Sequence, residues 1–315
     1  MNKLFIRTLI AVSGVFGAGL AQAQTFPSKP VTILVGTGAG GNPDTIARVF
    51  KAQVDRKWKQ TVIVDNRTGG GGAIALRALV NAAPDGHTLM SGASATHGLF
   101  FKDPGFRFED LTPATVVGSS LYGLLVSKSL NVKTLGEFVA YAKANTGKLN
   151  FGAIPSTSHE VEISNIQRLL GIQGTAIPYK GMAEVYTALI AGELHATVHS
   201  NSPQVKSGQV VPLAFGGQSR SPDAAGIPIF KELGYDYHPG VSFIFYARAG
   251  SPADNLNRVA AEVAEMVKGA EFQDRVARPL GITGLGLTHE ASIKSVNDDY
   301  ERVRAGVLRL GIKPQ

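Results

Sequence analysis

One strand, one loop and the start of one helix follow each other in Val31-Thr-Ile-Leu-Val-Gly-Thr-Gly-Ala-Gly-Gly-Asn-Pro-Asp44. Val31–Val35 is a short β-branched run, which is typical of a buried strand. Proline suits the first turn of a helix and an acidic side chain suits its N-terminus, so Pro43 and Asp44 predict a helix through Val54. The glycine-rich residues Gly36–Asn42 form the loop between them. This order is the beginning of an α/β fold.

The alternation of strands and helices continues along the chain, which predicts parallel sheets with helices on their faces. Further strands are predicted at Thr61–Val64, Thr88–Ser91, Leu121–Ser127, Leu149–Ala153, Thr175–Pro178, Leu194–Val198, Val210–Phe215 and Val241–Ala247. Helices are predicted at Ala73–Ala82, after the Thr134-Leu-Gly-Glu137 capping box, at His159–Leu170, from Tyr179-Lys180-Gly181 to Ala191, from Ser251, and near Glu271–Arg278 and Ser292–Leu308.

The two sets of alternating elements predict two lobes. The strands Leu121–Ser127 and Val241–Ala247 are the expected crossovers, and two crossings make a hinge. We therefore assign residues 24–121 and 248–315 to a discontinuous first lobe. Residues 122–247, including the crossover strands, form the second.

The first 23 residues have the pattern of a secretory signal peptide. Lys3 and Arg7 precede the uncharged, apolar stretch Leu9–Leu20, and Ala21-Gln-Ala23 supplies a small-x-small cleavage site. An N-terminal core helix would leave this asymmetry unexplained. We expect cleavage after Ala23 and a mature periplasmic protein, because no later stretch approaches the roughly 18 apolar residues of a membrane span.

Composition narrows the function further. The chain has no cysteine, which excludes disulfides, thiol chemistry and a lipid anchor at the cleavage site. Its formal charge is +7, or +5 without the leader, but the basic residues are scattered and no run of five occurs. Nucleic acid is therefore not an expected partner, and the field mildly favours anionic ligands.

The glycine loop permits three interpretations. Gly36-Thr-Gly-Ala-Gly-Gly41 satisfies the G-x-G-x-x-G dinucleotide fingerprint, with Asp65 at the end of the next strand. Export, the glycine run after Asp65 and the acidic Asp44 at the helix start weigh against a nucleotide. The glycines can instead allow close packing of strand and helix. The third interpretation is capture of a carboxylate by N–H groups at the helix N-terminus.

Two other loops enter helices in the same way. Ala93-Ser-Ala-Thr-His97 and Pro155-Ser-Thr-Ser-His159 both place hydroxyls and an imidazole there. A hydrogen bond to an ionised ligand contributes roughly 1.5–3 kcal/mol. A handful of them, less the entropy cost of association, reaches the ~8 kcal/mol of micromolar binding.

Catalytic and metal interpretations are weaker. His195 and His199 lie on one predicted strand, roughly 13 Å apart, too far to share a metal. Ser158-His159 lacks the G-x-S-x-G elbow of a hydrolase. Lys180 can offer a charge to an acidic ligand or be an ordinary solvated lysine, and His199 can line the pocket or the surface. We expect Asp44 to cap its own helix rather than meet an anion directly.

Several motifs together resemble the periplasmic solute-binding proteins of the tripartite tricarboxylate transporter family, also called the Bug family. They run along the mature chain and are Phe26-Pro-Ser-Lys-Pro30, Gly40-Gly-Asn-Pro-Asp44, Val64-Asp-Asn-Arg-Thr-Gly-Gly70, Ala82-Ala-Pro-Asp-Gly-His-Thr88, Lys143-Ala-Asn-Thr-Gly-Lys-Leu-Asn150, Pro178-Tyr-Lys-Gly181 and Gly250-Ser-Pro252. The resemblance implies a two-lobed type II periplasmic binding protein fold that closes over a carboxylate and passes it to a membrane permease.

The family pattern implies ligand contacts in Thr37–Asp44, Ser94–Thr96 and Ser156–His159. The chain departs from it in the first loop, which reads Gly-Thr-Gly-Ala where Pro-Phe/Tyr-Pro-Pro is usual. It departs again in Gly192–Gly208, which is shorter and carries His195, His199 and Asn201 where an aspartate-containing turn is common. Both departures leave the identity of the ligand open.

The expected function is capture of a small mono- or dicarboxylate by a monomer, without cofactor, metal or catalysis. The alternatives are an exported dinucleotide-dependent oxidoreductase using Gly36–Gly41 and a ligand-sensing partner of a membrane receptor. The residues expected to line the site are Thr37, Ala39, Gly40, Asn42, Asp44, Ser94, Ala95, Thr96, Ser156, Thr157, Ser158, His159, Tyr179, Lys180, His199 and Asn201.

Overall fold

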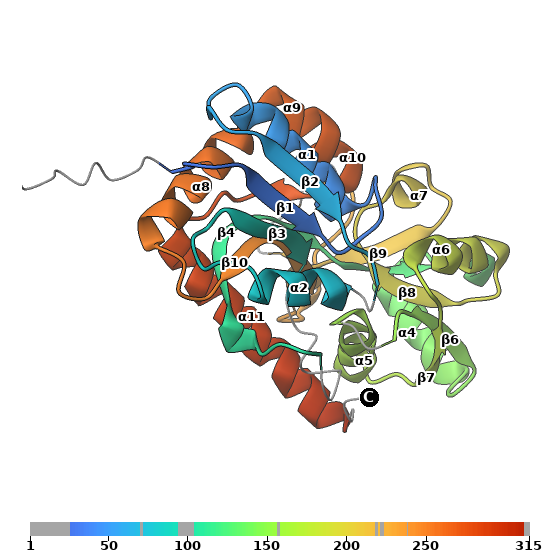
Figure 1. Ribbon diagram of the computed structural model, residues 1–315. Helices are drawn as coiled ribbons and strands as arrows, with labels where there is room; N and C mark the ends of the chain where they lie inside the picture. Colours follow the sequence, from blue (N-terminus) through green and yellow to red (C-terminus); the bar gives the residue numbers. More distant parts are fainter. Residues whose placement is uncertain are drawn as a thin grey trace, which may run out of the picture.

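The computed structural model describes residues 26–69, 72–93, 104–155, 158–217, 220, 224–237 and 239–311. These residues form two sheets with helices on both faces, which gives a two-lobed α/β fold (Figure 1). The proposed signal peptide lies outside the described residues.

The first sheet has the strand order β11-β4-β10-β3-β1-β2. Its strands are β1 (Val31–Val35), β2 (Val62–Asn66), β3 (Thr88–Ala93), β4 (Leu111–Leu121), β10 (Gly240–Arg248) and β11 (Thr283–Gly284). The parallel trio β2-β1-β3 confirms the predicted alternation. One face packs on α1 (Asn42–Val54), α8 (Ala253–Met266) and the segment of α9 (Ala270–Phe272), a π-turn (Gln273–Ala277) and α10 (Arg278–Leu280). The other face packs on α2 (Ala73–Val80) and α11 (His289–Leu310).

The second sheet has the order β7-β6-β8-β5-β9. Its strands are β5 (Gly123–Val126), β6 (Leu149–Ala153), β7 (Gly174–Pro178), β8 (Ala196–His199) and β9 (Val211–Phe215). Helices α4 (Leu135–Ala144) and α5 (Ser158–Leu170) cover one face. Helices α6 (Met182–Ala191) and α7 (Pro203–Lys206) cover the other. Short 3₁₀ turns occur at Phe108–Asp110, Lys128–Leu130 and Phe230–Leu233.

The predicted crossover strand Leu121–Ser127 is wrong as a single element. The chain runs along β4 in the first sheet, passes through Tyr122, and continues as β5 in the second. The sequence analysis missed β4 because Pro113 interrupts its apolar run, and proline argues against a strand interior. In the structure Pro113 lies at a bulge opposite Tyr246, beyond the two residues that β11 covers.

The second predicted crossover also needs correction. Strand β10 pairs with β3 and β4 along its length, so it belongs to the first sheet and not to the second lobe. The return crossing is at Pro239, just before β10, because the described residues 224–237 still pack in the core of the second lobe. It lies beside the first crossing, because Tyr122 donates its N–H to the Pro239 carbonyl (2.9 Å) and accepts one from Gly216 (2.8 Å). We propose that the lobes divide at Tyr122 and just before Gly240.

Helix α11 is a third connection between the lobes. It packs against β4 of the first sheet and also against α5 of the second lobe. Gly306 allows the close approach: a Cβ there would lie 2.4 Å from Cγ1 of Val161. Close by, Arg302 of α11 forms an ion pair with Glu162 of α5, whose side chain is fully buried.

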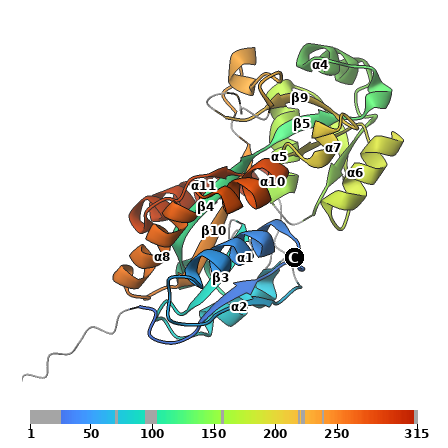
Figure 2. The same cartoon turned by 90° about the horizontal axis from the view of Figure 1, so that it is seen from above.

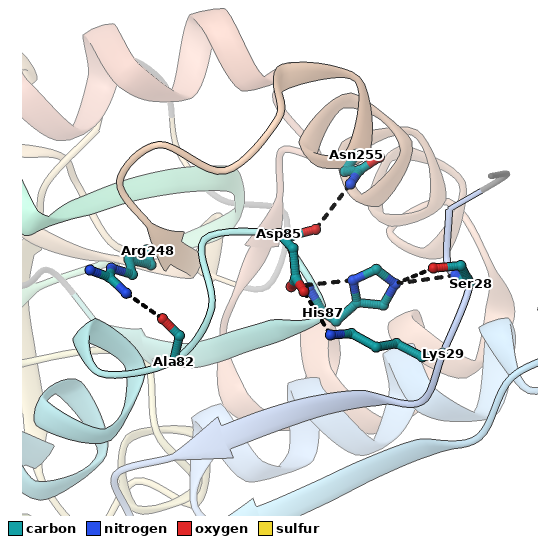
Figure 3. Close-up of polar contacts among 7 residues, drawn as sticks. All are labelled: Ser28, Lys29, Ala82, Asp85, His87, Arg248 and Asn255. Carbon is teal, nitrogen blue, oxygen red and sulfur yellow. Dashed lines mark hydrogen bonds and ion pairs between the residues drawn. The ribbon is translucent and has the colours of Figure 1, made fainter. Parts of the chain in front are cut away.

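Motifs from three parts of the chain meet at the outer end of the first lobe, where β1 and β3 begin (Figures 2 and 3). Ser28 donates its N–H to Nε2 of His87 (3.1 Å), and Lys29 forms an ion pair with Asp85 (2.7 Å). The Asn255 amide donates to the Asp85 carbonyl (2.9 Å). These segments, which carry much of the family resemblance, hold Ser28 and Lys29 in place far from the second lobe.

Candidate functional site

The carboxyl ends of the parallel strands in both sheets lie beside the lobe crossings. In the first sheet Ala93, the last residue of β3, pairs with Phe243 near the start of β10. In the second sheet His199, the last residue of β8, pairs with Gly123, which directly follows Tyr122. The carboxyl ends of these two strands therefore face the other lobe (Figure 2). Ligands of open α/β sheets bind at such edges.

The glycine loop of the first lobe is held by its own helix. Thr37–Gly40 is exposed, Gly40 donates its N–H to Oδ2 of Asp44 (2.9 Å), and Gly41 donates to the Gly38 carbonyl (3.2 Å). The N–H groups of Gly40 and Gly41 are therefore already hydrogen-bonded and are not available to a ligand carboxylate. This corrects the expectation for Gly40, whose N–H was predicted to help capture an anion.

Asp44 places a buried carboxylate in the first turn of α1. It is 1 % exposed and also accepts hydrogen bonds from Nε of Arg48 (2.8 Å) and the Asn66 amide (2.9 Å). Burial raises the pKa of this carboxyl, but the hydrogen bonds from Arg48, Gly40 and Asn66 outweigh it, so the pKa lies below its usual value. Asp44 thus has a structural role, although it binds the N–H of Gly40 in the loop rather than capping the helix, and its lack of contact with the ligand stays a prediction. The i,i+4 spacing of Asp44 and Arg48 was a signal that the sequence analysis did not use.

The same geometry leaves little room for a dinucleotide. The pyrophosphate of such a cofactor would need the helix N-terminus that Asp44 occupies. Asp65, the expected ribose partner, is paired with Arg67 (2.8 Å). A Cβ on Gly36 would lie 2.7 Å from Cα of Gly72, so this glycine permits close contact between two loops.

In the second lobe, His159 is part of the core rather than a free ligand group. It is 4 % exposed, Nδ1 accepts the N–H of Ile154 (3.1 Å), and Nε2 lies 2.7 Å from the Val198 carbonyl, to which it donates. Burial lowers its pKa to about 4, so the ring is neutral at physiological pH. Both nitrogens are engaged, which corrects the expectation that His159 contacts the ligand. Its ring instead ties the loop before α5 to β8.

His199 lies at the carboxyl edge among aromatic rings. It is half-buried, and its ring stacks on Tyr122 with centroids 5.4 Å apart. Nδ1 lies 2.9 Å from the hydroxyl of Tyr186 on α6. Burial and then the nearby His159 lower the pKa of His199 to about 3. Burial raises the pKa of both tyrosines, that of Tyr186 to about 12.

The sequence analysis missed Tyr122 and Tyr186. In the sequence, each tyrosine occupies a position where an apolar residue of a strand or helix is expected. The signal that could have found Tyr122 is its place between two strands of different lobes.

The other predicted residues are placed less centrally. Tyr179 is half-buried against the core beside α6, and Lys180 is exposed. Asn201 lines a cavity of about 40 Å³ at the lobe junction, well below the roughly 300–1,000 Å³ of ligand pockets. The expected contacts Ser94, Ala95, Thr96, Ser156 and Thr157 lie outside the described residues. Thr37 and Ala39 are exposed in the glycine loop, and Asn42 and Ser158 are half-buried at the first residues of α1 and α5.

Metal clusters and membrane-spanning helices are absent from the same described ranges. No cluster of three or more His, Cys, Asp or Glu residues is arranged to hold a metal there. None of the described helices has the length and apolar character of a membrane span. His195 lies just before β8, at the end opposite His199, and its Nδ1 accepts the Asn150 N–H (3.0 Å).

Comparison with known proteins identifies relatives of this fold. The family model described as tripartite tricarboxylate transporter family receptor matches residues 46–278. Protein BugT of Bordetella pertussis is 32 % identical over 318 residues, covering 96 % of each chain. An R. palustris protein solved with adipate is 25 % identical, with a TM-score of 0.80 over 92 % of this chain and 100 % of that one. MatC of Rhodopseudomonas palustris, solved with malate, is 25 % identical, with a TM-score of 0.74 over 90 % and 100 %.

Proposed function

The chain belongs to the family of tripartite tricarboxylate transporter receptors, and we propose that it captures a small organic carboxylate between its lobes and delivers it to the membrane permease of such a transporter. The matching family model describes receptors, which supports a binding role. The resemblance to the structures with adipate and malate supports a mono- or dicarboxylate as the ligand.

The observation that carries this proposal is the juxtaposition of the two carboxyl edges beside the crossings. One edge bears the glycine loop and the end of β3, and the other bears the start of α5 and His199. The donors proposed on these edges are backbone N–H groups, hydroxyls and the His199 ring, all of which are neutral at physiological pH. Hydrogen bonds from neutral groups to a carboxylate still contribute about 1.5–3 kcal/mol each.

The second lobe provides the stronger half of this site. The first residues of α5, beginning with Ser158, have N–H groups that suit an anion, and Ser156 and Thr157 just before the helix would add hydroxyls. The first lobe would add Thr37, Asn42 and the segment Ser94–Thr96. In this division Asp44 shapes the glycine loop without touching the ligand.

The proposal also includes the route to the site. The leader through Ala23 would direct the chain to the periplasm, where the mature protein would work as a monomer. A receptor with a hinge of two adjacent crossings can open to admit the ligand and close around it.

A thermal-shift screen of the mature protein, residues 24–315, tests the function. The panel holds adipate, malate, succinate, acetate and benzoate, with putrescine as a cationic control of similar length to succinate. We expect at least one acid to raise the melting temperature in a concentration-dependent manner. Stabilisation by putrescine alone, or by no acid at millimolar concentration, would contradict the proposal.

A further inference from the structure

The two ring nitrogens of His199 have different surroundings. Nδ1 lies 2.9 Å from the Tyr186 hydroxyl and 3.4 Å from that of Ser200. Nε2 has no hydrogen-bond partner among the described residues. It is also absent from the described polar atoms that are both buried and without a partner. This nitrogen therefore reaches the surface, at the edge of the second sheet that faces the first lobe.

The position of the ring is fixed from several sides. Tyr122 stacks on one face, with an interplanar angle of 23°. The Tyr186 ring and the His159 ring meet it edge-on, with centroids 5.7 and 6.3 Å away. A ring held in this way has little freedom to turn and exchange its two nitrogens.

The Tyr186 hydroxyl decides which nitrogen carries the proton. Tyr186 is 5 % exposed, so its hydroxyl hydrogen needs an acceptor within the protein. A neutral imidazole nitrogen without hydrogen is a better acceptor than a phenol oxygen. A proton on Nδ1 would require the Tyr186 hydrogen to turn to the Ser202 hydroxyl, and the Ser200 hydroxyl, 3.4 Å from Nδ1, would lose that nitrogen as an acceptor. The Tyr186 hydroxyl therefore donates to Nδ1, and the proton of the neutral ring is on Nε2.

The surrounding groups keep the ring neutral. Tyr122, His159 and Tyr186 are the described rings packed against it, and none carries a charge at neutral pH. Burial, followed by the proximity of His159, lowers the pKa of His199 to about 3. Nε2–H is thus a donor whose strength does not vary across the physiological pH range.

We propose that Tyr186 is a positioning residue that fixes His199 as its Nε2–H tautomer, so that the second lobe meets the ligand carboxylate with a neutral N–H donor. This inference rests on the proposed function for the identity of the acceptor. The tautomer itself is a property of the ligand-free protein. A neutral donor orients a carboxylate without the retention that a buried lysine or arginine would cause.

Nitrogen NMR of mature protein carrying ¹⁵N-histidine tests the tautomer directly. We expect Nδ1 of His199 to have the chemical shift of an unprotonated acceptor and Nε2 that of a protonated nitrogen. Tyr186→Phe keeps the ring and its packing and removes only the hydroxyl. In that variant we expect a mixture of the two tautomers, with a single cooperative melting transition as the check on folding.

Adipate titration into the same samples tests the donor. We expect the Nε2 signal of His199 to shift on adipate addition and that of His195, at the other end of β8, to stay. Tyr186→Phe should weaken adipate binding about 5-fold and His199→Phe about 10- to 100-fold, whereas the control His195→Phe should change it less than about 2-fold.

Two results would overturn the inference. One is a wild-type His199 protonated on Nδ1. The other is a Tyr186→Phe variant with the tautomer and the adipate affinity of the wild type. Loss of adipate binding in every sample, with the expected tautomer present, would count against the carboxylate function and the donor role together, and leave Tyr186 as a positioning residue only.

Discussion

Replacement of Asp44 by alanine removes the group that holds the glycine loop to α1. The buried carboxylate accepts hydrogen bonds from Gly40, Arg48 and Asn66. Three hydrogen bonds to a charged group would contribute more than ~4 kcal/mol if all were buried. The Arg48 side chain is 44 % exposed, so water replaces much of its share. We expect Asp44→Ala to lower the free energy of unfolding by about 2–3 kcal/mol, and Asp44→Asn by about 1–2 kcal/mol.

Urea denaturation at pH 7 measures this loss as a lower midpoint at an unchanged slope. The matched control is Asp65→Ala, which breaks the exposed pair with Arg67 and should cost less than about 1 kcal/mol. If Asp44→Ala and Asp65→Ala are equally stable, the carboxylate does not organise the loop as described.

The pH dependence of the same variant has a definite sign. Hydrogen bonds lower the folded-state pKa of Asp44 below its unfolded value of about 3.9, despite burial, which raises it. Its contribution is therefore fully present above the unfolded pKa and is lost as the pH falls through the folded pKa. The stability difference between wild type and Asp44→Ala should be constant from about pH 6 to 8 and shrink below about pH 4. A difference that grows on acidification would refute the reasoning.

Three further changes test other parts of the structure. Arg302→Ala leaves the buried Glu162 without its ion-pair partner. Urea denaturation should show that the free energy of unfolding falls by about 2–4 kcal/mol. An unchanged midpoint would mean that the ion pair between the lobes contributes nothing to stability. Gly306→Ala should lower the free energy of unfolding by about 1–3 kcal/mol, because the added Cβ would clash with Val161. The double variant with Val161→Ala should recover part of this loss. Strictly additive losses of the two single variants would argue against the contact. Burial lowers the pKa of His159 to about 4 in the folded state, so on acidification the unfolded chain binds the proton first. The free energy of unfolding should therefore decrease between about pH 6.5 and pH 4 more steeply in the wild type than in His159→Gln. Parallel pH profiles of the two proteins would contradict this assignment.

Much of the fold follows from patterns that are local in sequence. The strand and helix at the glycine loop, and the second set of alternating elements, are where β-branched runs, caps and glycines place them. The missed strand β4 and the misplaced strand β10 have a common cause. Local patterns indicate that a segment is extended, but pairing with distant strands decides which sheet it joins. Pro113 and Gly118 are unfavourable inside a strand and therefore argued against β4. Pairing with the long strand β10 stabilises β4 in the structure.

The candidate site shows the same limit. The loops after the strands could be predicted because parallel strands place their carboxyl ends at one edge. The roles of individual side chains could not. His159 has the sequence context of a ligand contact, yet its two nitrogens bind the backbone of nearby Ile154 and of distant Val198. Tyr186 reads as a core residue of α6, and its importance appears only where its hydroxyl meets His199.

Calorimetric titration of a stabilising acid, with one variant on each facing edge, tests capture between the lobes most directly. Asn42→Ala changes the first lobe and Ser158→Ala the second, both at half-buried helix starts. The account predicts one site per chain in the wild type and weakening by about 1–3 kcal/mol in each variant, with the fold intact. Full affinity in both variants, or a loss confined to one lobe, would contradict it.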